Sequence, residues 1–542
     1  ISAFYHDSAA TIIKDGKIIA AAQEERFTRI KHDPSFPTNS IKFVLKYCNI
    51  KLSNIDHIIF FEKPFLKFER LLETYVAFAP KGFWQFTKSM PLWLKNKLFQ
   101  KKQILDDLKK INNSFIDEKK LFFSEHHLSH AASAFYPSPF NEAIILTADG
   151  VGEWATTTVA IGRGNELEIL KELHFPHSLG LLYSAFTYYT GFKVNSGEYK
   201  LMGLAPYGEP KYSKIIKDNL IDIKEDGTFK LNQTYFDYAT GFKMTSKKFN
   251  LLFGNKERDS NNEEINQFHM DIAASIQEIT EEIMIKLTSS LSKEYKLKNL
   301  CMAGGVALNC VANGKILKKN IFDNIWIQPA SGDAGGSLGA CLAFWYKHLK
   351  KNRVIDKNDS MQGSLLGPEY KQNDIEEKLT DLGAKFETFN LDELINKTVS
   401  SIINGDAVGW FQGRMEFGPR ALGSRSILGD PRSEKMQKNL NLKVKYRESF
   451  RPFAPSILED DLENWFDIKI ESPYMLMVGN VSKNKSFDMS EEEKKLFGIE
   501  KLNTKRSEIP AVTHVDYSAR IQTVNFERNK LYYKLISEFK KK

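Results

Sequence analysis

The sequence has few cysteines and no membrane or export signal. Its four cysteines, Cys48, Cys301, Cys310 and Cys341, form no CxxC pair, so we expect reduced thiols rather than a disulfide framework. No apolar run approaches the roughly 18 residues that a membrane helix needs. No charged-then-apolar signal peptide opens the chain, which begins at Ile1 rather than Met. We therefore expect a cytoplasmic protein that does not span a membrane.

A large charge surplus is also missing. The 76 Lys and Arg residues exceed the 68 Asp and Glu residues by only 8. Nucleic-acid binding proteins usually carry a clustered basic face, so no nucleic-acid partner is expected. Hydrophobic residues make up 42% and charged residues 27%, which is typical of a globular enzyme. A chain of 542 residues is too long for one hydrophobic core, which indicates two or more domains.

The pattern strand, acidic loop, strand, turn, strand occurs twice. It appears in residues 1–25, where Asp15-Gly16 marks a tight turn, and again in residues 142–173. The repetition favours a duplicated α/β domain of the actin, sugar-kinase and Hsp70 type (ASKHA), although two unrelated hairpins would look the same. Apolar spacing predicts helices over residues 39–50 and 266–296. We predict a first domain over residues 1–350, a polar linker over 351–369, and a smaller α/β domain over 370–542.

Three histidines lie close together in EHHLSHAASAF, residues 125–135. His126 and His130 are four positions apart, so on a helix they share one face, about 6 Å apart along the axis. This spacing suits two ligands of one metal ion, and the alternative is a pair of structural histidines. His127 faces elsewhere, as a supporting or surface residue. The glutamate of an HExxH motif is absent, which argues against a zinc protease.

Two aspartates make the metal interpretation stronger. Asp149 ends an apolar strand in LTADGVGE, and Asp333 lies in the glycine-rich turn PASGDAGGSLGA. Acidic residues at strand ends lie at the mouth of an α/β cleft, where ligands bind. Two His and two Asp suit Fe²⁺, Mn²⁺ or Zn²⁺, and a metal there could bridge to nucleotide phosphates.

Glycines follow two of the predicted strands. They allow close backbone approach, and helix N-termini favour phosphate. Any tightly packed turn also uses glycine, so each signal is weak alone. The candidate nucleotide-binding residues are Gly304, Gly305, Asn309, Gly332 and Gly335, with Gly336 able to serve similarly.

The second domain is rich in arginine. Arginine forks bind phosphate and carboxylate in a bidentate manner, and the interleaved Gly, Pro and Phe argue against a plain solvated charge run. Structural salt bridges are expected to account for about half of the set. The basic residues between 414 and 451 are Arg414, Arg420, Arg425, Arg432, Lys445, Arg447 and Arg451, and Ser518 and Arg520 open a later strand.

Motifs along most of the chain resemble those of one enzyme family. They include FYHDSAA, HHLSHAASAFYPSPF, TADGVGEW, GEYKLMGLAPYG, AGGVALNC, GDAGGSLGA, FGPRALGSRSILGDPR, YRESFRPFAPS and PAVTHVDYSARIQTV. They occur in family order from the first residue to about residue 524. The chain is similar to O-carbamoyltransferases of the nodulation and antibiotic-tailoring type, the NodU/CmcH/TobZ family.

This resemblance implies a fold and a reaction. The N-terminal domain would be like the Kae-type tRNA threonylcarbamoyl transferases, and the C-terminal domain like YrdC. The YrdC-like domain would make carbamoyl-adenylate from carbamoyl phosphate and ATP with Mg²⁺. The Kae-like domain would pass the carbamoyl group to a hydroxyl of a sugar or natural product.

The resemblance also implies roles for single residues. His6 would be the general base. The metal, Fe²⁺ first and Mn²⁺ or Zn²⁺ otherwise, would be held by His126, His130, Asp149 and Asp333. Carbamoyl phosphate would be held by Lys445, Arg447, Ser518 and Arg520, with Arg414 and Arg420 as further candidates.

The sequence differs from the family pattern in two ways, and three alternative functions remain open. Tyr517 stands where the family usually has glycine, and the chain ends at SEFKKK, before a segment that family members carry. We therefore expect residues 370–542 to be a C-terminally truncated domain. The rivals are a tRNA-modifying threonylcarbamoyl enzyme, a non-catalytic nucleotide-binding module and a kinase. Residues 62–120, aromatic and basic in turn, are the expected place for acceptor binding, and neither acceptor identity nor oligomeric state can be deduced.

Overall fold

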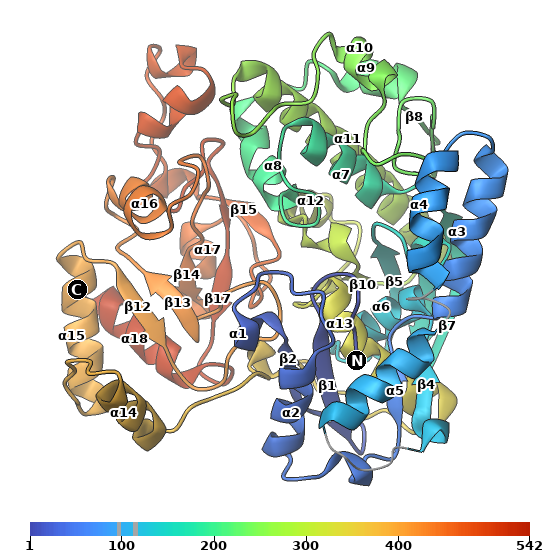
Figure 1. Ribbon diagram of the computed structural model, residues 1–542. Helices are drawn as coiled ribbons and strands as arrows, with labels where there is room; N and C mark the ends of the chain where they lie inside the picture. The colour runs from blue at the N-terminus through green and yellow to red at the C-terminus, as the bar shows by residue number, and fades with distance from the viewer. Residues whose placement is uncertain (95–98, 112–116) are drawn as a thin grey trace. The chain divides into compact units, whose positions relative to one another are not determined.

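The computed structural model describes residues 1–94, 99–111 and 117–542, which form two compact units, Ile1–Ser360 and Met361–Lys542 (Figure 1). The division falls inside the segment 351–369 that the sequence predicts as a linker. Residues 351–360 nevertheless pack onto the first unit. There the guanidinium of Arg353 donates hydrogen bonds to the carbonyls of Phe135, Tyr136 and Ser138.

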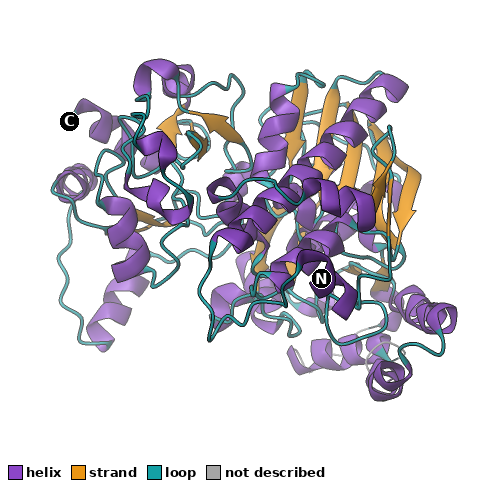
Figure 2. Cartoon of the chain, turned by 90° about the horizontal axis from the view of Figure 1, so that it is seen from above, coloured by secondary structure: helices purple, strands orange, loops and turns teal. Residues whose placement is uncertain are grey.

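A five-stranded mixed sheet forms the centre of the first unit, and its strands lie side by side in Figure 2. In spatial order the strands are β11 (Asn324–Ile327), β10 (Asn299–Ala303), β5 (Glu142–Ala148), β6 (Ala155–Arg163) and β7 (Glu166–His174). β10 runs parallel to β5 and β11, whereas β6 is antiparallel to β5 and β7. Six of the seven residues of β5 are buried, as expected for a strand covered on both faces.

The remaining strands of the first unit before β5 are β1 to β4, and their arrangement resembles that of the five-stranded sheet. The hairpin β1 (Ala9–Lys14) and β2 (Lys17–Gln23) is antiparallel, and β3 (Ile58–Phe60) pairs in parallel with β4 (Leu121–Phe123). The N-terminal residues lie between them, because Ser2 bridges Ala9 and the Ile1 amino group donates to the Ile59 carbonyl, 2.8 Å away. When the N-terminal bridge is counted as a first strand, the spatial order is third, second, first, fourth, fifth in both groups of strands.

The strand predicted over residues 1–5 is reduced to this single bridge. The backbone turns at Phe4, whose φ of 72° lies in the left-handed region. The chain therefore leaves the sheet two residues before His6.

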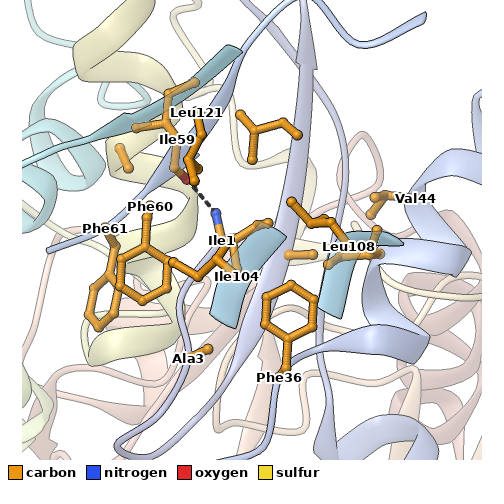
Figure 3. Packing of buried hydrophobic residues seen from close by; sticks show 14 of the residues in the cluster. Ile1, Ala3, Phe36, Val44, Ile59, Phe60, Phe61, Ile104, Leu108 and Leu121 are labelled. Atoms are coloured by element: carbon orange, nitrogen blue, oxygen red, sulfur yellow. Dashed lines mark hydrogen bonds between the residues drawn. The ribbon is translucent and has the colours of Figure 1, made fainter. Parts of the chain in front are cut away.

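Figure 3 shows the hydrophobic core formed mainly by residues of the N-terminal part of the first unit. Ile1, Phe36 and Phe60 come from the N-terminal segments, and Ile104 and Leu108 come from α5 (Gln100–Ile111). Ile104 and Leu108 are fully buried. This part of the segment expected to bind the acceptor therefore belongs to the core.

The remaining elements of the first unit are mostly helices that flank these strands. They are α1 (Glu25–Thr28), α2 (Thr38–Tyr47), α3 (Pro64–Phe78), α4 (Phe83–Trp93), α6 (His126–Phe135), α7 (Leu179–Tyr189), α8 (Glu198–Leu204), α9 (Ser213–Asn219), β8 (Ile221–Ile223), β9 (Phe229–Leu231), α10 (Lys247–Phe253), α11 (Gln267–Tyr295), α12 (Cys310–Lys318) and α13 (Asp333–Ala343). The helices predicted at 39–50 and 266–296 correspond to α2 and α11. No helix in the part of the chain that the structure describes is long and apolar enough to cross a membrane.

Helices α6 and α13 cross closely because α13 carries glycine at the contact. A Cβ added to Gly339 would lie 1.7 Å from the Ser129 carbonyl oxygen on α6. Ala is the better helix former, by about 1 kcal/mol. The overlap must nevertheless push the helix backbones apart, and such overpacking costs about 1–3 kcal/mol.

We therefore expect Gly339→Ala to lower the melting temperature of the protein, measured by circular dichroism. Gly409→Ala is the matched control, because an added Cβ there meets no atom within 4 Å. Equal melting temperatures for Gly339→Ala and the wild type would show that α6 and α13 are not held at this distance.

The second unit is also a mixed α/β structure, built from three two-stranded sheets. The sheets pair β12 (Val408–Phe411) with β13 (Arg425–Leu428), β14 (Ser456–Leu458) with β17 (Gln522–Val524), and β15 (Val478–Asn480) with β16 (Ser518–Arg520). Its helices are α14 (Gln372–Asp381), α15 (Leu391–Ile403), α16 (Met436–Asn439), α17 (Leu462–Trp465) and α18 (Lys530–Lys541). A core cluster joins Val399 of α15, Trp410 of β12 and Leu535 of α18.

Candidate metal centre

Helix α6 presents His126 and His130 on one face, as the spacing predicts. The two Nε2 atoms lie 3.1 Å apart. Both side chains are buried, with 2% and 0% exposed. The backbone N–H of His126 donates to both carboxylate oxygens of Glu153, each at 3.1 Å, so Glu153 occupies the positive end of the helix.

Two aspartates complete the cluster. Asp149 follows β5 directly, and its Oδ2 lies 3.1 Å from Nε2 of His126 and 3.6 Å from that of His130. Asp333 lies at the first position of α13 rather than in a free turn, and its Oδ1 is 3.7 Å from both Nε2 atoms. All four ligand atoms lie within 4.8 Å of one another. The structure thus brings the four predicted ligands together from three elements.

The donor set fits a divalent cation. The Nε2 atoms of His126 and His130 face each other. A single proton shared between them would satisfy this contact alone. Oδ1 of Asp333, which is 1% exposed, has no hydrogen-bond partner among the described residues. Buried polar atoms without partners are costly, and a cation bound by two imidazoles and two carboxylates removes that cost. Mixed N and O ligands suit Fe²⁺, Mn²⁺ and Zn²⁺ alike.

The electrostatics of the cluster favour positive charge. Burial alone would lower the pKa of His130, but hydrogen bonding and charge from Asp149 and Asp333 raise it to about 9. Burial alone would raise the pKa of Asp149, but the two histidines hold it well below its usual range. The two carboxylates therefore stabilise whichever cation, proton or metal, lies among the four side chains.

Residues that the sequence analysis did not single out surround the cluster. Glu62, only 1% exposed, places Oε2 3.9 Å from Nδ1 of His126 and accepts a 2.7 Å hydrogen bond from Nζ of Lys67. His127 is buried, with Nδ1 2.7 Å from Oγ1 of Thr147, so of the two positions that the sequence left open it takes the supporting one. The signal that could have found Glu62 is FEKPFLKFER, where charged residues alternate with aromatic ones. In a single sequence, this pattern is indistinguishable from the pattern of an exposed, charged helix.

Oε2 of Glu62 lies 3.9 Å from Nδ1 of His126, beyond hydrogen-bond distance, and we expect it to accept that N–H once the ring holds a metal. A carboxylate that accepts the second N–H of a metal-bound imidazole typically contributes a factor of about 10–100 in metal affinity. We expect Glu62→Gln to weaken metal binding by about that factor, measured by competition with a chelator. Glu69→Gln is the control, because Glu69 is exposed on α3, the helix that follows Glu62. Equal metal affinities for Glu62→Gln and the wild type would show that Glu62 has no role in metal binding.

His6 lies beside the cluster. Its Nε2 is 3.7 Å from Oδ2 of Asp333, and its Nδ1 is 3.0 Å from Oδ2 of Asp7. The other oxygen of Asp7 lies 2.8 Å from Nδ1 of His32. Burial alone would lower the pKa of His6, but Asp333 and Asp7 raise it to about 9. Asp7 therefore fixes the ring of His6 with Nε2 toward the four-ligand cluster.

The candidate nucleotide-binding residues have mixed surroundings. Gly305 donates its N–H to Oδ1 of Asp149 at 2.8 Å, and Gly332 caps α13 with open space around it. Gly304 has a φ of 90°, and a Cβ there would lie 2.2 Å from the Ala148 carbonyl oxygen. Gly335 is equally constrained, since its Cβ would lie 2.1 Å from the Ala330 oxygen. Backbone packing alone therefore requires glycine at 304 and 335.

Asn309 has a clear structural role. Its Oδ1 accepts the N–H of Ala312 and so caps α12. Its amide also pairs with that of Gln277 through two hydrogen bonds of 3.0 and 3.1 Å. Most of its polar capacity is thus used within the protein.

In the second unit several of the predicted basic residues gather around Lys445. Desolvation of its ammonium and the positive charges of Arg447, Arg451 and Arg425 lower the pKa of Lys445. Arg447 donates from Nε to Oδ1 of Asn441 at 2.6 Å, which holds its guanidinium in place. Arg425 lies 2.9 Å from Glu416 and Arg451 lies 3.6 Å from Glu448, so their charges are partly compensated, and Lys445 with Arg447 is the pair that suits phosphate.

The other basic candidates are placed differently. Arg414 donates to the carbonyls of Gly367 and Leu366, and Arg432 pairs with Asp430. The carbonyl of Arg420 accepts a hydrogen bond from Arg425 at 3.4 Å, which places Arg420 next to the basic cluster. Arg414 and Arg432 thus use their guanidinium groups in structural hydrogen bonds and ion pairs within the protein.

Ser518 and Arg520 lie in β16, paired with β15. The Oγ of Ser518 donates to Asp516 at 2.6 Å. Tyr517, at the position where the resembling family has glycine, has a φ of 65°, and its hydroxyl donates to the Phe487 carbonyl at 2.8 Å. The turn therefore keeps the left-handed backbone that glycine would adopt easily.

Comparisons with known proteins match two successive parts of the chain. The family model described as "Carbamoyltransferase N-terminus" matches residues 1–342, and the one described as "Carbamoyltransferase C-terminus" matches residues 399–542. The protein sll1178 of Synechocystis sp. is 56% identical over 99% of this chain and 88% of its own length. Nodulation protein NolNO of Sinorhizobium fredii is 35% identical over 99% of this chain and 72% of its own.

Similarity to solved structures is weaker. HypF of T. kodakarensis matches 62% of this chain and 47% of its own, with 13% identity and a TM-score of 0.27. A score this low supports no inference about the site.

Proposed function

The chain belongs to the carbamoyltransferase family, and we propose that it is an ATP- and carbamoyl-phosphate-dependent O-carbamoyltransferase that modifies a hydroxyl of a sugar or natural product. The observation that carries this proposal is the buried cluster of His126, His130, Asp149 and Asp333 with His6 beside it. A metal site next to an oriented imidazole suits acyl transfer to a hydroxyl.

We further propose that the first unit is a duplicated ASKHA-type domain and the second a YrdC-like domain. The strand succession third, second, first, fourth, fifth in both halves of the first unit supports the duplication. An acidic residue follows the first strand of each half, Asp7 in one and Asp149 in the other. The basic cluster around Lys445 supports assignment of carbamoyl phosphate to the second unit.

The proposed activation step balances with one water. Water releases inorganic phosphate from carbamoyl phosphate and leaves carbamate. A carbamate oxygen then attacks the α-phosphate of Mg²⁺-bound ATP, and pyrophosphate leaves. Carbamoyl-adenylate is the product. Lys445 and Arg447 would hold the phosphate of carbamoyl phosphate through charge-assisted hydrogen bonds.

In the proposed transfer step the acceptor oxygen attacks the carbamoyl carbon. The bond between that carbon and the adenylate oxygen breaks, and AMP leaves. The Nε2 of His6 would take the hydroxyl proton. Asp7 accepts from Nδ1 and so keeps Nε2 available. Gly332 precedes Asp333 at the N-terminus of α13, where its backbone N–H would contact the adenylate phosphate, whereas the N–H of Gly305 is already donated to Oδ1 of Asp149.

A divalent metal held by the four ligands would supply positive charge that stabilises the developing negative charge during transfer. Its charge would also offset that of Asp333, which otherwise raises the pKa of His6. This would favour the neutral form of His6, which a general base needs. Fe²⁺ is the proposed ion, with Mn²⁺ and Zn²⁺ as alternatives.

The proposal is tested by pyrophosphate release from ATP. The full chain, loaded with metal, is incubated with Mg²⁺-ATP with and without carbamoyl phosphate, and with acetyl phosphate as a donor that lacks the amide. We expect release that requires carbamoyl phosphate. Release that is absent, or independent of carbamoyl phosphate, would contradict the proposal and favour a non-catalytic nucleotide-binding module or a kinase.

A further inference from the structure

The outer face of α4 carries large apolar side chains that are open to solvent. Trp84 is 75% exposed and Phe83 is 48% exposed, and their ring centroids lie 5.6 Å apart. Pro91 and Leu94 are also exposed, and helical spacing places them on the same side as Trp84 and Phe83. Single exposed apolar residues are common on proteins, but a group of them on one face marks an interaction site.

The inner face of α4 is fixed by contacts within the first unit. The ring of Phe86 stacks on that of Tyr75 in α3, with 3.8 Å between centroids and an interplanar angle of 14°. Gln85 donates from Nε2 to the carbonyl of Gly241 at 2.6 Å. Helices α3 and α4 thus pack together at the edge of the first unit (Figure 1). These contacts determine which side of α4 faces outward.

The loop that contacts α4 extends the apolar surface. The ring of Phe242, next to Gly241, is 69% exposed. The ammonium of Lys88, one helical turn after Trp84, lies 5.6 Å from the centroid of that ring. We call Phe83, Trp84, Pro91, Leu94 and Phe242 the exposed patch.

The sequence around the exposed patch is basic. No acidic residue occurs between Glu73 and Asp106, whereas six lysines do, namely Lys81, Lys88, Lys95, Lys97, Lys101 and Lys102. Acidic side chains of other segments approach two of them, since Lys81 lies 3.9 Å from Asp237 and Lys101 lies 2.6 Å from Glu118. The segment therefore combines apolar rings with an excess of positive charge.

This combination distinguishes between two kinds of partner. Protein–protein interfaces are rich in aromatic residues but depleted in lysine. Segments that lie on an anionic bilayer instead combine Trp and Phe with lysine, since the rings enter the headgroup region and the ammonium groups approach lipid phosphates. Helix α4 has 11 residues and is about 16 Å long, so it can lie on a bilayer but cannot span one.

We propose that the exposed patch docks the first unit onto the surface of an anionic lipid bilayer. Phe83 and Trp84 enter the headgroup region, and Lys88 lies at the level of the lipid phosphates. The protein is then a peripheral membrane protein held by apolar contact and charge together. This inference is independent of the reaction that the chain catalyses.

The test measures partition of the full chain into lipid vesicles by co-sedimentation. Vesicles of phosphatidylcholine alone are compared with vesicles in which about a third of the lipid is phosphatidylglycerol. We expect the partition coefficient to be at least about 10-fold higher for the anionic vesicles, because each lysine near an anionic surface adds about 5-fold. We expect high salt to reduce this difference.

Trp84→Ser tests the apolar part of the contact. The substitution is expected to lower the partition coefficient on anionic vesicles by about 10-fold, since Trp anchors segments at the bilayer interface. Val354→Ser is the matched control, because Val354 is 87% exposed in the first unit and lies outside the exposed patch. The control is expected to partition like the wild type. Both positions are exposed, so both variants are expected to keep the melting temperature of the wild type.

Lys88→Glu tests the electrostatic part. Reversal of this charge is expected to lower partition into anionic vesicles by about 10-fold or more and to change partition into neutral vesicles by less than about 2-fold. Lys42→Glu is the comparison, because Lys42 is an exposed lysine on α2. It is expected to partition like the wild type.

Four results would overturn the inference. A wild-type chain that stays in solution with both kinds of vesicle does not bind bilayers. Equal partition into neutral and anionic vesicles would exclude the role of charge. Equal partition of Trp84→Ser and the wild type would place the contact outside the exposed patch. If the wild type self-associates in sedimentation velocity without vesicles and Trp84→Ser is monomeric, the exposed patch is an interface between two copies of the chain.

Discussion

Replacing His126 and His130 together with alanine is expected to abolish tight binding of a divalent metal. The double variant removes both nitrogen ligands of a four-ligand cluster and leaves Asp149 and Asp333 alone. The loss of one well-placed partner at a metal site already costs about 10–100-fold, so losing two ligands is expected to cost at least about 1,000-fold. We expect the wild type to retain about one metal ion per chain after dialysis and the variant to retain none. Metal content is measured by inductively coupled plasma mass spectrometry.

His127→Gln is the matched control for this measurement. His127 is as buried as the two ligands and lies on the same helix, but its Nδ1 pairs with Thr147. The control should therefore retain the metal. Because the double variant leaves two buried carboxylates without imidazole partners, its fold is checked by circular dichroism, and Asp333→Asn serves as a variant of nearly the same shape. A full equivalent of metal in the folded double variant would exclude this cluster as the metal site.

Lys445→Ala is expected to raise KM for carbamoyl phosphate by about 10–100-fold. The lowered pKa of Lys445 reflects desolvation and three neighbouring arginines, and such a cluster is stabilised by a bound anion. A hydrogen bond to a charged group contributes about 1.5–3 kcal/mol, which corresponds to roughly this factor in affinity. The measurement is the initial rate of pyrophosphate release at varied carbamoyl phosphate, with ATP saturating.

Lys443→Ala provides the comparison: both lysines are exposed and lie two positions apart, but the charges of Arg447, Arg451 and Arg425 act on Lys445. Its KM for carbamoyl phosphate should equal that of the wild type. A further readout is salt, since an exposed electrostatic site loses affinity as ionic strength rises. Equal KM values for the Lys445 and Lys443 variants would place the carbamoyl phosphate site elsewhere in the second unit.

The gathering of His126, His130, Asp149 and Asp333 could be predicted because its signals are local. A spacing of four on a helix places His126 and His130 on one face whatever the rest of the fold, and Asp149 directly follows an apolar strand. Asp333 was expected near the cluster, but its position at the first residue of α13 depends on where that helix begins. Helix boundaries are the least predictable feature of a sequence pattern.

Glu62, Lys67, Arg70 and Glu153 could not be predicted in the same way. Their burial depends on how α3 packs against the loop 149–153, which no short stretch of sequence encodes. Charged residues are almost never fully buried unless paired, so an unaided sequence interpretation places them at the surface.

Some sequence signals had more than one cause. A glycine needed for helix packing is indistinguishable in sequence from one that approaches phosphate, as Gly335 shows. The strand predicted at residues 1–5 shortened to one bridge because the backbone turns at Phe4, a left-handed conformation that a Phe residue gives no reason to expect.

The central claim is that the cluster in the first unit serves carbamoyl transfer, while the basic cluster in the second unit serves activation. The most direct measurement follows pyrophosphate and carbamoylated product together, in the wild type and in the His126→Ala, His130→Ala variant, with radiolabelled carbamoyl phosphate and a set of sugars as hydroxyl acceptors. We predict that the variant keeps carbamoyl-phosphate-dependent pyrophosphate release and loses the carbamoylated product. Loss of both activities in a folded variant, or retention of both, would contradict this division of labour.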